Sequence, residues 1–173
     1  HDASNSYIRN TNTNLIIKNE YDDGDIIFES DDGSGNIAEY FRLDGSQASS
    51  PYVYTRFPDY SVAAFGNGNN LQVYHTDTTG FIAEYEGDLK IINHANDSDI
   101  QLMSDDGSGS VTTYLRLDGS HNKMIAYKDI HFEDNIKARF GNYATADLEI
   151  YHDGNNSYIK EQGTGVLYIQ GSG

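Results

Sequence analysis

Short apolar runs alternate with polar turns along the whole chain. The runs are rich in Ile, Val, Tyr and Phe and are bounded by Asn, Asp, Gly and Ser, which predicts β-strands. No window has apolar residues spaced three and four positions apart over a dozen residues, so helices are not expected. The predicted strands are residues 6–9, 14–19, 25–30, 37–44, 52–57, 61–66, 71–75, 81–84, 88–93, 99–104, 111–118, 124–128, 135–141, 148–152, 157–160 and 166–170.

The same segments return at a long, nearly constant spacing. LQVYH at 71–75 returns as LEIYH at 148–152, and YFRLDGS at 40–46 returns as YLRLDGS at 114–120. Such self-similarity is the signature of an array in which each unit packs mainly on its neighbours. We count one unit at 1–74, a second at 75–151 and the start of a truncated third at 152–173, each opening on a histidine.

A comparison of the two full units predicts which side of each strand is buried. Leu71 and Val73 match Leu148 and Ile150, whereas Gln72 between them is replaced by Glu149. Successive side chains of a strand point to opposite faces, so each strand has one apolar face. We expect the apolar face to point inward and the varying face to be exposed.

The supply of apolar residues is thin. Leu, Ile, Val and Phe make up about a fifth of the chain, close to the level at which independent folding becomes doubtful. Such a chain either stays disordered or shares a core with other copies of itself. The regular alternation favours the shared core. The fold class that we predict is all-β, an elongated repetitive structure of the β-solenoid or β-helix type.

Charge and composition exclude several partners. Net charge is −16, with 27 acidic and 11 basic residues. Such a surface repels phosphate backbones, so nucleic-acid binding is not expected. No cysteine is present to form a disulfide, and no apolar stretch reaches membrane-spanning length. The chain lacks an initiator Met and a signal peptide and opens in the middle of a motif, so we expect a segment of a longer or processed protein.

The repeats resemble those of a known class of virion proteins. LEIYHDGNNSYI at 148–159, preceded by FGNYATAD at 140–147, is similar to repeats in tail-fibre and related structural proteins of tailed phages, particularly phages of marine cyanobacteria. Residues 105–120 and 128–141 look like the same repeats. The resemblance implies an extended β-structured fibre, usually an intertwined homotrimer, exposed outside the cell on the virion surface. It supplies no catalytic residues.

Two groups of residues are candidate metal ligands. DDGSG occurs twice and provides Asp31, Asp32, Asp105 and Asp106, whose carboxylates could hold calcium. The EF-hand spacing is missing, so ordinary turn chemistry is the favoured interpretation. The recurring histidines (His1, His75 and His152) could meet on a trimer axis and hold a transition metal, because His75 is in phase with Leu71 and Val73. A surface histidine at a turn is the simpler interpretation.

Tyr74 and Tyr151 fall on the varying face of their strands, beside Gln72 and Glu149. Tyrosines exposed among polar residues could stack on sugars of a host-surface glycan. The simpler interpretation is that they cover a thin sheet and add cross-strand contacts.

An enzyme is not expected. Among 27 acidic residues chance carboxylate pairs will occur, and no sequence feature selects one pair as a glycosidase site. Nucleophile-elbow, phosphate-loop and metalloprotease motifs are missing. The expected function is structural, a shaft segment of a phage tail fibre that supports host attachment and needs no cofactor. The alternatives are a lectin-like repeat module and a subunit of a self-assembling extracellular β-fibril.

Overall fold

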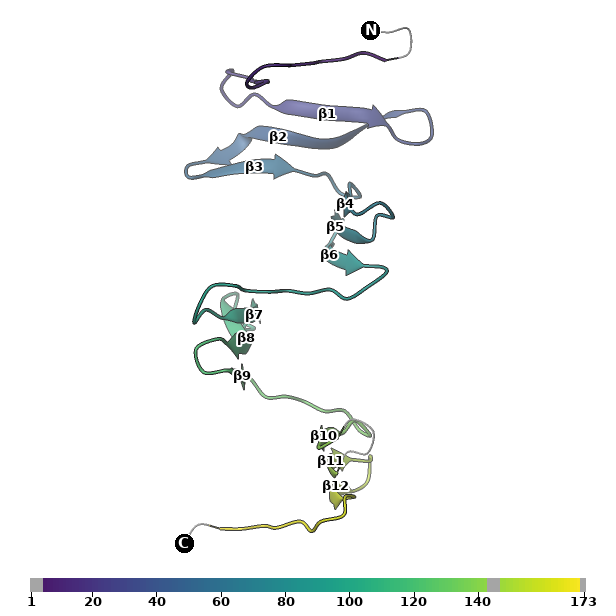
Figure 1. Cartoon of the computed structure of the whole chain (residues 1–173), viewed down its shortest axis with the longest axis vertical. Helices are drawn as coiled ribbons and strands as arrows, with labels where there is room; N and C mark the ends of the chain where they lie inside the picture. The colour runs from purple at the N-terminus through teal and green to yellow at the C-terminus, as the bar shows by residue number, and fades with distance from the viewer. Residues whose placement is uncertain (1–4, 143–146, 172–173) are drawn as a thin grey trace. The chain divides into compact units, whose positions relative to one another are not determined.

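The computed structural model describes residues 5–142 and 147–171, and within them the chain is all-β (Figure 1). No described segment forms a helix able to cross a membrane. The twelve strands of the described part are β1 (Ile26–Asp31), β2 (Ile37–Ser49), β3 (Tyr52–Arg56), β4 (Ala63–Phe65), β5 (Leu71–Thr76), β6 (Thr79–Glu84), β7 (Ile100–Asp105), β8 (Val111–Asp118), β9 (Lys123–Ala126), β10 (Ala138–Phe140), β11 (Leu148–His152) and β12 (Ser157–Glu161). Each of them coincides with a predicted strand.

The strands form four open antiparallel sheets of three strands each, in the order of the sequence. The contacts divide the chain into His1–Lys90, with β1-β2-β3 and β4-β5-β6, and Ile91–Gly173, with β7-β8-β9 and β10-β11-β12. The all-β class is therefore confirmed, while the described residues form neither a solenoid nor a β-helix. The unit boundaries counted from the sequence, at 74/75 and 151/152, fall inside β5 and β11 because the repeat was counted from its histidines.

Corresponding sheets of the two units share one register. Phe28 lies opposite Phe41 in the first sheet and Leu102 lies opposite Leu115 in the third, each followed by a β-bulge. One residue earlier, on the side of this pair away from the bulge, Ile27 faces Arg42 and Gln101 faces Arg116. The alternating residues thus form an apolar face and a polar face on the first and third sheets, as the sequence comparison predicts.

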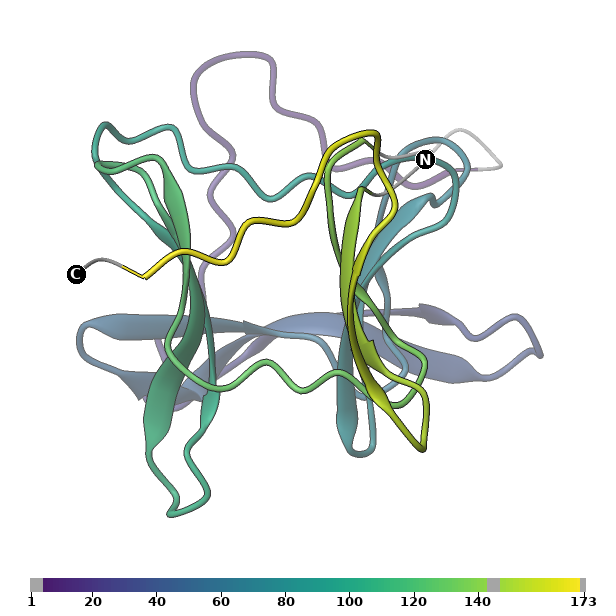
Figure 2. The same ribbon diagram turned by 90° about the horizontal axis from the view of Figure 1, so that it is seen from below.

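Four predicted strands are not formed within the single chain, namely residues 6–9, 14–19, 88–93 and 166–170. A strand exists only when a neighbour completes its hydrogen bonds. Residues 14–19, 88–93 and 166–170 run as single extended segments (Figures 1 and 2), and their main chain forms no main-chain hydrogen bond in the described part of the chain.

No hydrophobic residue of the described part is buried. The buried residues there are Asp44, Asp118 and Glu149, at 3%, 5% and 4% exposure. The prediction that the varying face is exposed is therefore wrong at Glu149, whereas Ile27 and Gln101 on the varying face of β1 and β7 are exposed. Glu149 is covered through its ion pairs with Lys137 and Arg139.

Candidate functional site

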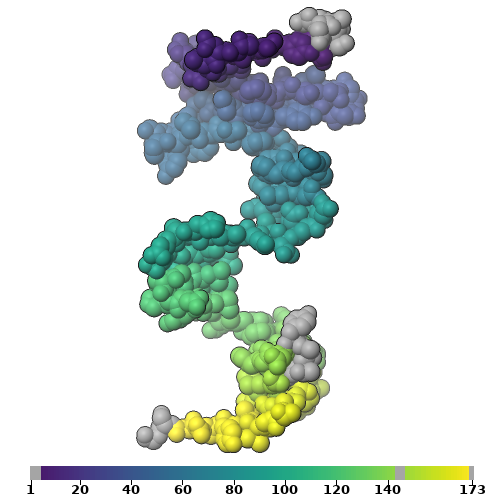
Figure 3. Space-filling view, in the orientation of Figure 1, coloured from purple at the N-terminus to yellow at the C-terminus, as the bar shows by residue number. Residues whose placement is uncertain are grey.

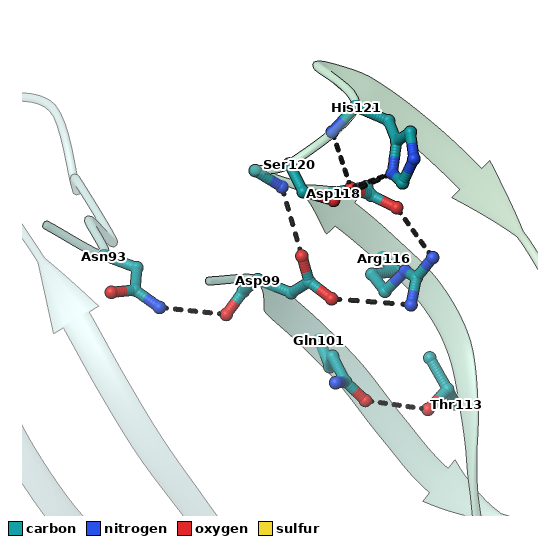
Figure 4. A network of polar contacts seen from close by, with 9 residues as sticks. Asn93, Asp99, Gln101, Thr113, Arg116, Asp118, Ser120 and His121 are labelled. Atoms are coloured by element: carbon teal, nitrogen blue, oxygen red, sulfur yellow. Dashed lines mark hydrogen bonds and ion pairs between the residues drawn. The ribbon is translucent and has the colours of Figure 1, made fainter. Parts of the chain in front are cut away.

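The RLDGS segment of each unit, at 42–46 and 116–120, organises a polar network on one face of its sheet. In the second unit Arg116 Nη2 donates to Asp118 Oδ2 at 2.7 Å, and Arg116 Nη1 lies 3.4 Å from Asp99 Oδ2 (Figure 4). The Gly119 amide donates to Asp99 Oδ1 at 3.1 Å. One guanidinium thus joins the start of β7 to the end of β8.

The first unit repeats this network with one substitution. Arg42 Nη1 donates to Asp25 Oδ2 at 2.9 Å, and the Gly45 amide donates to Asp25 Oδ1 at 2.9 Å. Here the guanidinium also forms a bidentate pair with Glu39, at 2.7 and 2.5 Å. The second unit has Thr113 at the position of Glu39. Arg42 and Asp25 thus pair as Arg116 and Asp99 do, whereas Asp44 forms its ion pair with Arg56, at 3.6 Å.

The buried carboxylates in these networks are stabilised in their ionised form. The Ser120 hydroxyl donates to Asp118 Oδ1 at 2.8 Å and the His121 amide donates to it at 2.9 Å. These hydrogen bonds, with Arg116 nearby, lower the pKa of Asp118 to about 2. The pKa of Asp44 is lowered likewise, chiefly by the Ser46 hydroxyl.

The glycine of LDGS permits a close approach of two backbones. A Cβ on Gly119 would overlap the carbonyl oxygen of Ser98, and a Cβ on Gly45 would lie 2.6 Å from the carbonyl oxygen of Gly24. Real Cβ atoms do not come this close to backbone. The glycine is therefore required by the turns that precede β1 and β7, the first strands of the first and third sheets.

The fourth sheet has its own polar face, built around Glu149 of β11. Lys137 Nζ donates to Glu149 Oε2 at 2.7 Å, and Arg139 Nε lies 3.2 Å from Oε1. The bond from Lys137 lowers the pKa of Glu149. The ring of Tyr151 stacks on Tyr158 at 4.8 Å, and Lys137 Nζ lies 4.6 Å from its centroid.

The glycan interpretation requires tyrosines that are exposed on the surface. Tyr74 and Tyr151 are instead half-buried in ring pairs. Tyr74 stacks on Phe81 at a centroid distance of 4.8 Å, which matches the Tyr151–Tyr158 pair in the other unit. Both tyrosines are half-buried and make cross-strand pairs.

His75 and His152 lie on the apolar face of their sheets, in phase with Val73 and Ile150. His75 Nδ1 lies 2.7 Å from Asp59 Oδ1, and His152 Nδ1 lies 2.8 Å from Asp134 Oδ1. The aspartates follow Pro58 and Glu133 in the connections to β4 and β10, where sequence reasoning did not place a partner. His1 lies outside the described residues. Across the described part, no group of three or more His, Asp or Glu side chains could hold a metal ion.

The DDGSG carboxylates bind the backbone of their own turns. Asp105 accepts the amides of Gly107 at 2.7 Å and Gly109 at 3.1 Å, and Asp106 accepts that of Ser108 at 2.8 Å. In the first unit Asp31 accepts the Gly33 amide at 2.8 Å, and Asp32 accepts the Ser34 amide at 2.7 Å. The amides of Ser34 and Asn36 lower the pKa of Asp32 to about 2. The carboxylates thus serve as turn acceptors.

The remaining candidate surface is the set of open apolar faces. In the third sheet this face carries Leu102 at 55% exposure, Leu117 at 47% and Met124 at 68%. In the first sheet Phe28, Phe41 and Phe57 stack along the same face, at 4.4 and 5.7 Å between neighbouring centroids. In the first, third and fourth sheets the polar face is held by the chain's own ion pairs, although the buried Nε of Arg116 has no hydrogen-bond partner among the described residues, and the apolar face stays exposed.

Comparison with protein-family models, with curated proteins and with solved structures found no match for this chain.

Proposed function

We propose that this chain is a shaft segment of a homotrimeric phage tail fibre, which supports host attachment from the virion surface. The observation that carries the proposal is that every described hydrophobic residue remains accessible to solvent while the polar faces are internally paired. Burial of apolar surface is the dominant driving force of folding. The apolar faces must therefore be covered by another molecule.

The accessible area supports a large interface. The chain exposes 14737 Å². A folded monomer of 19.2 kDa exposes about 8,400 Å², so about 6,300 Å² per chain is in excess. Interfaces of permanent complexes run from about 2,000 to more than 5,000 Å². The excess is the size expected of a chain whose core forms only on assembly.

The repeats supply this uncovered surface at regular intervals, which suits a rod in which three chains share one core. The net charge of −16 gives such rods mutual repulsion and keeps them soluble. The tail-fibre resemblance of the LEIYHDGNNSYI segment supports a place on the virion. The proposal assigns the chain no catalytic role and no cofactor.

Immunogold electron microscopy of phage particles that carry the chain tests this assignment. Antibodies raised against the purified chain are expected to decorate the tail fibres between base and tip. Antibodies against an unrelated acidic protein provide the control. Label on the capsid, or label that is confined to free protein, would overturn the assignment.

A further inference from the structure

Three segments, 14–19, 88–93 and 166–170, have a strand sequence but no strand partner. They occupy the same place in successive repeats, after the SYI or FIA strand and a polar turn. Their shared apolar positions are two residues apart and consist of Leu15, Ile17, Leu89, Ile91, Leu167 and Ile169. These three segments are called the connecting segments below.

The apolar side chains of the connecting segments are exposed. Their exposure ranges from 42% for Leu167 to 86% for Ile169, with Ile17 at 56% and Ile91 at 64%. In Figures 1 and 3 the last connecting segment (yellow) leaves β12 as a single strip with no strand beside it.

The backbones of the connecting segments are also unpaired. Within the part of the chain that the structure describes, their main-chain groups form no hydrogen bond with another main-chain group. Elsewhere the same kind of sequence forms ladders, as in β5 and β11. Extended β-branched segments with free N–H and C=O groups are templates for strand addition.

A recurring side-chain contact closes the turn between each of the first two connecting segments and the strand that follows it. Asn19 Nδ2 donates to the carbonyl of Asp25 at 2.9 Å, and Asn93 Nδ2 donates to the carbonyl of Asp99 at 3.0 Å. The Oδ1 of Asn19 accepts the Tyr21 amide at 3.1 Å, so the asparagine closes the turn. The turn before β1 and β7 is therefore closed by a side chain, and the main chain that precedes it stays available.

We propose that the connecting segments become strands on assembly, each pairing through its backbone with a sheet edge of another copy of this chain. The inference rests on the proposed homotrimer and gives its mode of association. A second copy is the fitting partner because every full repeat provides one unpaired segment together with the free outer edges of its own sheets. Copies in register therefore satisfy one another at every repeat.

Hydrogen exchange on the assembled wild-type chain tests this pairing. The amides of residues 15–18 and 89–92 are expected to exchange at least 100-fold more slowly than in an unstructured peptide. An oligomer in which these amides exchange at the free-peptide rate would overturn the inference and leave the proposed homotrimer standing. A wild-type chain that remains a monomer would overturn both.

Proline substitution gives a second, independent test. Ile17→Pro and Ile91→Pro remove an amide that has no partner within the chain, so an unpaired connection would tolerate them. We expect each to weaken association at least tenfold. The matched control is Glu133→Pro, because Pro58 already occupies the corresponding position of the first unit and both carbonyls accept a turn amide. Association that is unchanged in both isoleucine variants would contradict the inference.

Discussion

Arg116 Nη2 donates to Oδ2 of Asp118 at 2.7 Å, on the face of β8 opposite to Leu115 and Leu117. In the first unit Arg42 pairs with Asp25, as Arg116 does with Asp99, and also pairs with Glu39. The two faces of the sheet therefore have different roles. The polar face holds the strands of one chain together, and the apolar face is left for assembly.

Replacing Arg116 by Ala should destabilise the third sheet. Asp118 would remain buried without its cationic partner, and an unpaired buried charge is strongly unfavourable. The expected fall in Tm is on the order of 5 °C, measured by circular dichroism at fixed protein concentration. Lys18→Ala, which removes an exposed pair with Glu20, is the control and should leave Tm within about 1 °C. Equal effects of the two changes would refute this role of Arg116.

The sequence predicts the strand positions, but it does not predict the side-chain contacts or which residues are buried. The alternation of LQVYH and its neighbours is enough to locate the strands that pair locally, because both partners lie within one hairpin. It does not reveal that Asp59 approaches His75, since that contact depends on the path of an irregular connection. The burial of Glu149 is not predicted, because a period-two pattern separates the two faces of a strand but does not show that ion pairs cover a side chain on the polar face.

Acid should lower the folding stability of the third sheet, because Asp118 is protonated at low pH. Asp118 has a pKa of about 2 in the folded chain, against an ordinary value of 3.8. A lowered folded-state pKa gives stability that is fully present above about pH 4 and is lost as the pH falls toward 2. Thermal unfolding between pH 7 and pH 2 is expected to show this loss. Asp118→Asn should be less stable at pH 7 and show a shallower acid dependence, and an equally steep curve would contradict the assignment.

The apolar face can be tested by a pair of adjacent substitutions in β7. Leu102→Glu places a charge on the open apolar face, whereas Gln101→Glu places it on the polar face, where the acceptor for Thr113 is retained. Burying a leucine is worth about 1.5–3 kcal/mol, so Leu102→Glu should weaken association more than tenfold. Gln101→Glu should leave association nearly unchanged. The reverse order of effects in a dilution series would show that the wrong face was assigned to assembly.

Gly119 should resist replacement although it lies in a polar turn. A Cβ there would overlap the backbone of Ser98, so Gly119→Ala is expected to lower Tm by several degrees. Gly87→Ala is the matched control, because nothing lies within 4 Å of the added Cβ. A Gly119→Ala variant as stable as Gly87→Ala would mean that the two turns do not pack as described.

Calcium should not stabilise the DDGSG turns. The Asp32 carboxylate accepts amides of its own turn, and Asp106 accepts the hydroxyl and the amide of Ser108. These bonds lower the pKa of both carboxyl groups. Adding calcium or a chelator is therefore expected to leave Tm unchanged, while Asp106→Ala lowers it and Asp106→Asn, which keeps the acceptor, has a smaller effect. A rise in Tm with calcium that disappears in Asp106→Asn would restore the calcium interpretation.

Sedimentation velocity of the purified chain tests the central claim most directly, because it gives mass and frictional ratio together. The account predicts three times the 19.2 kDa of one chain, with a high frictional ratio. That result would show that the open apolar faces are covered by other copies in an elongated particle. A compact 19.2 kDa monomer would contradict the account, because each chain would then complete its own core.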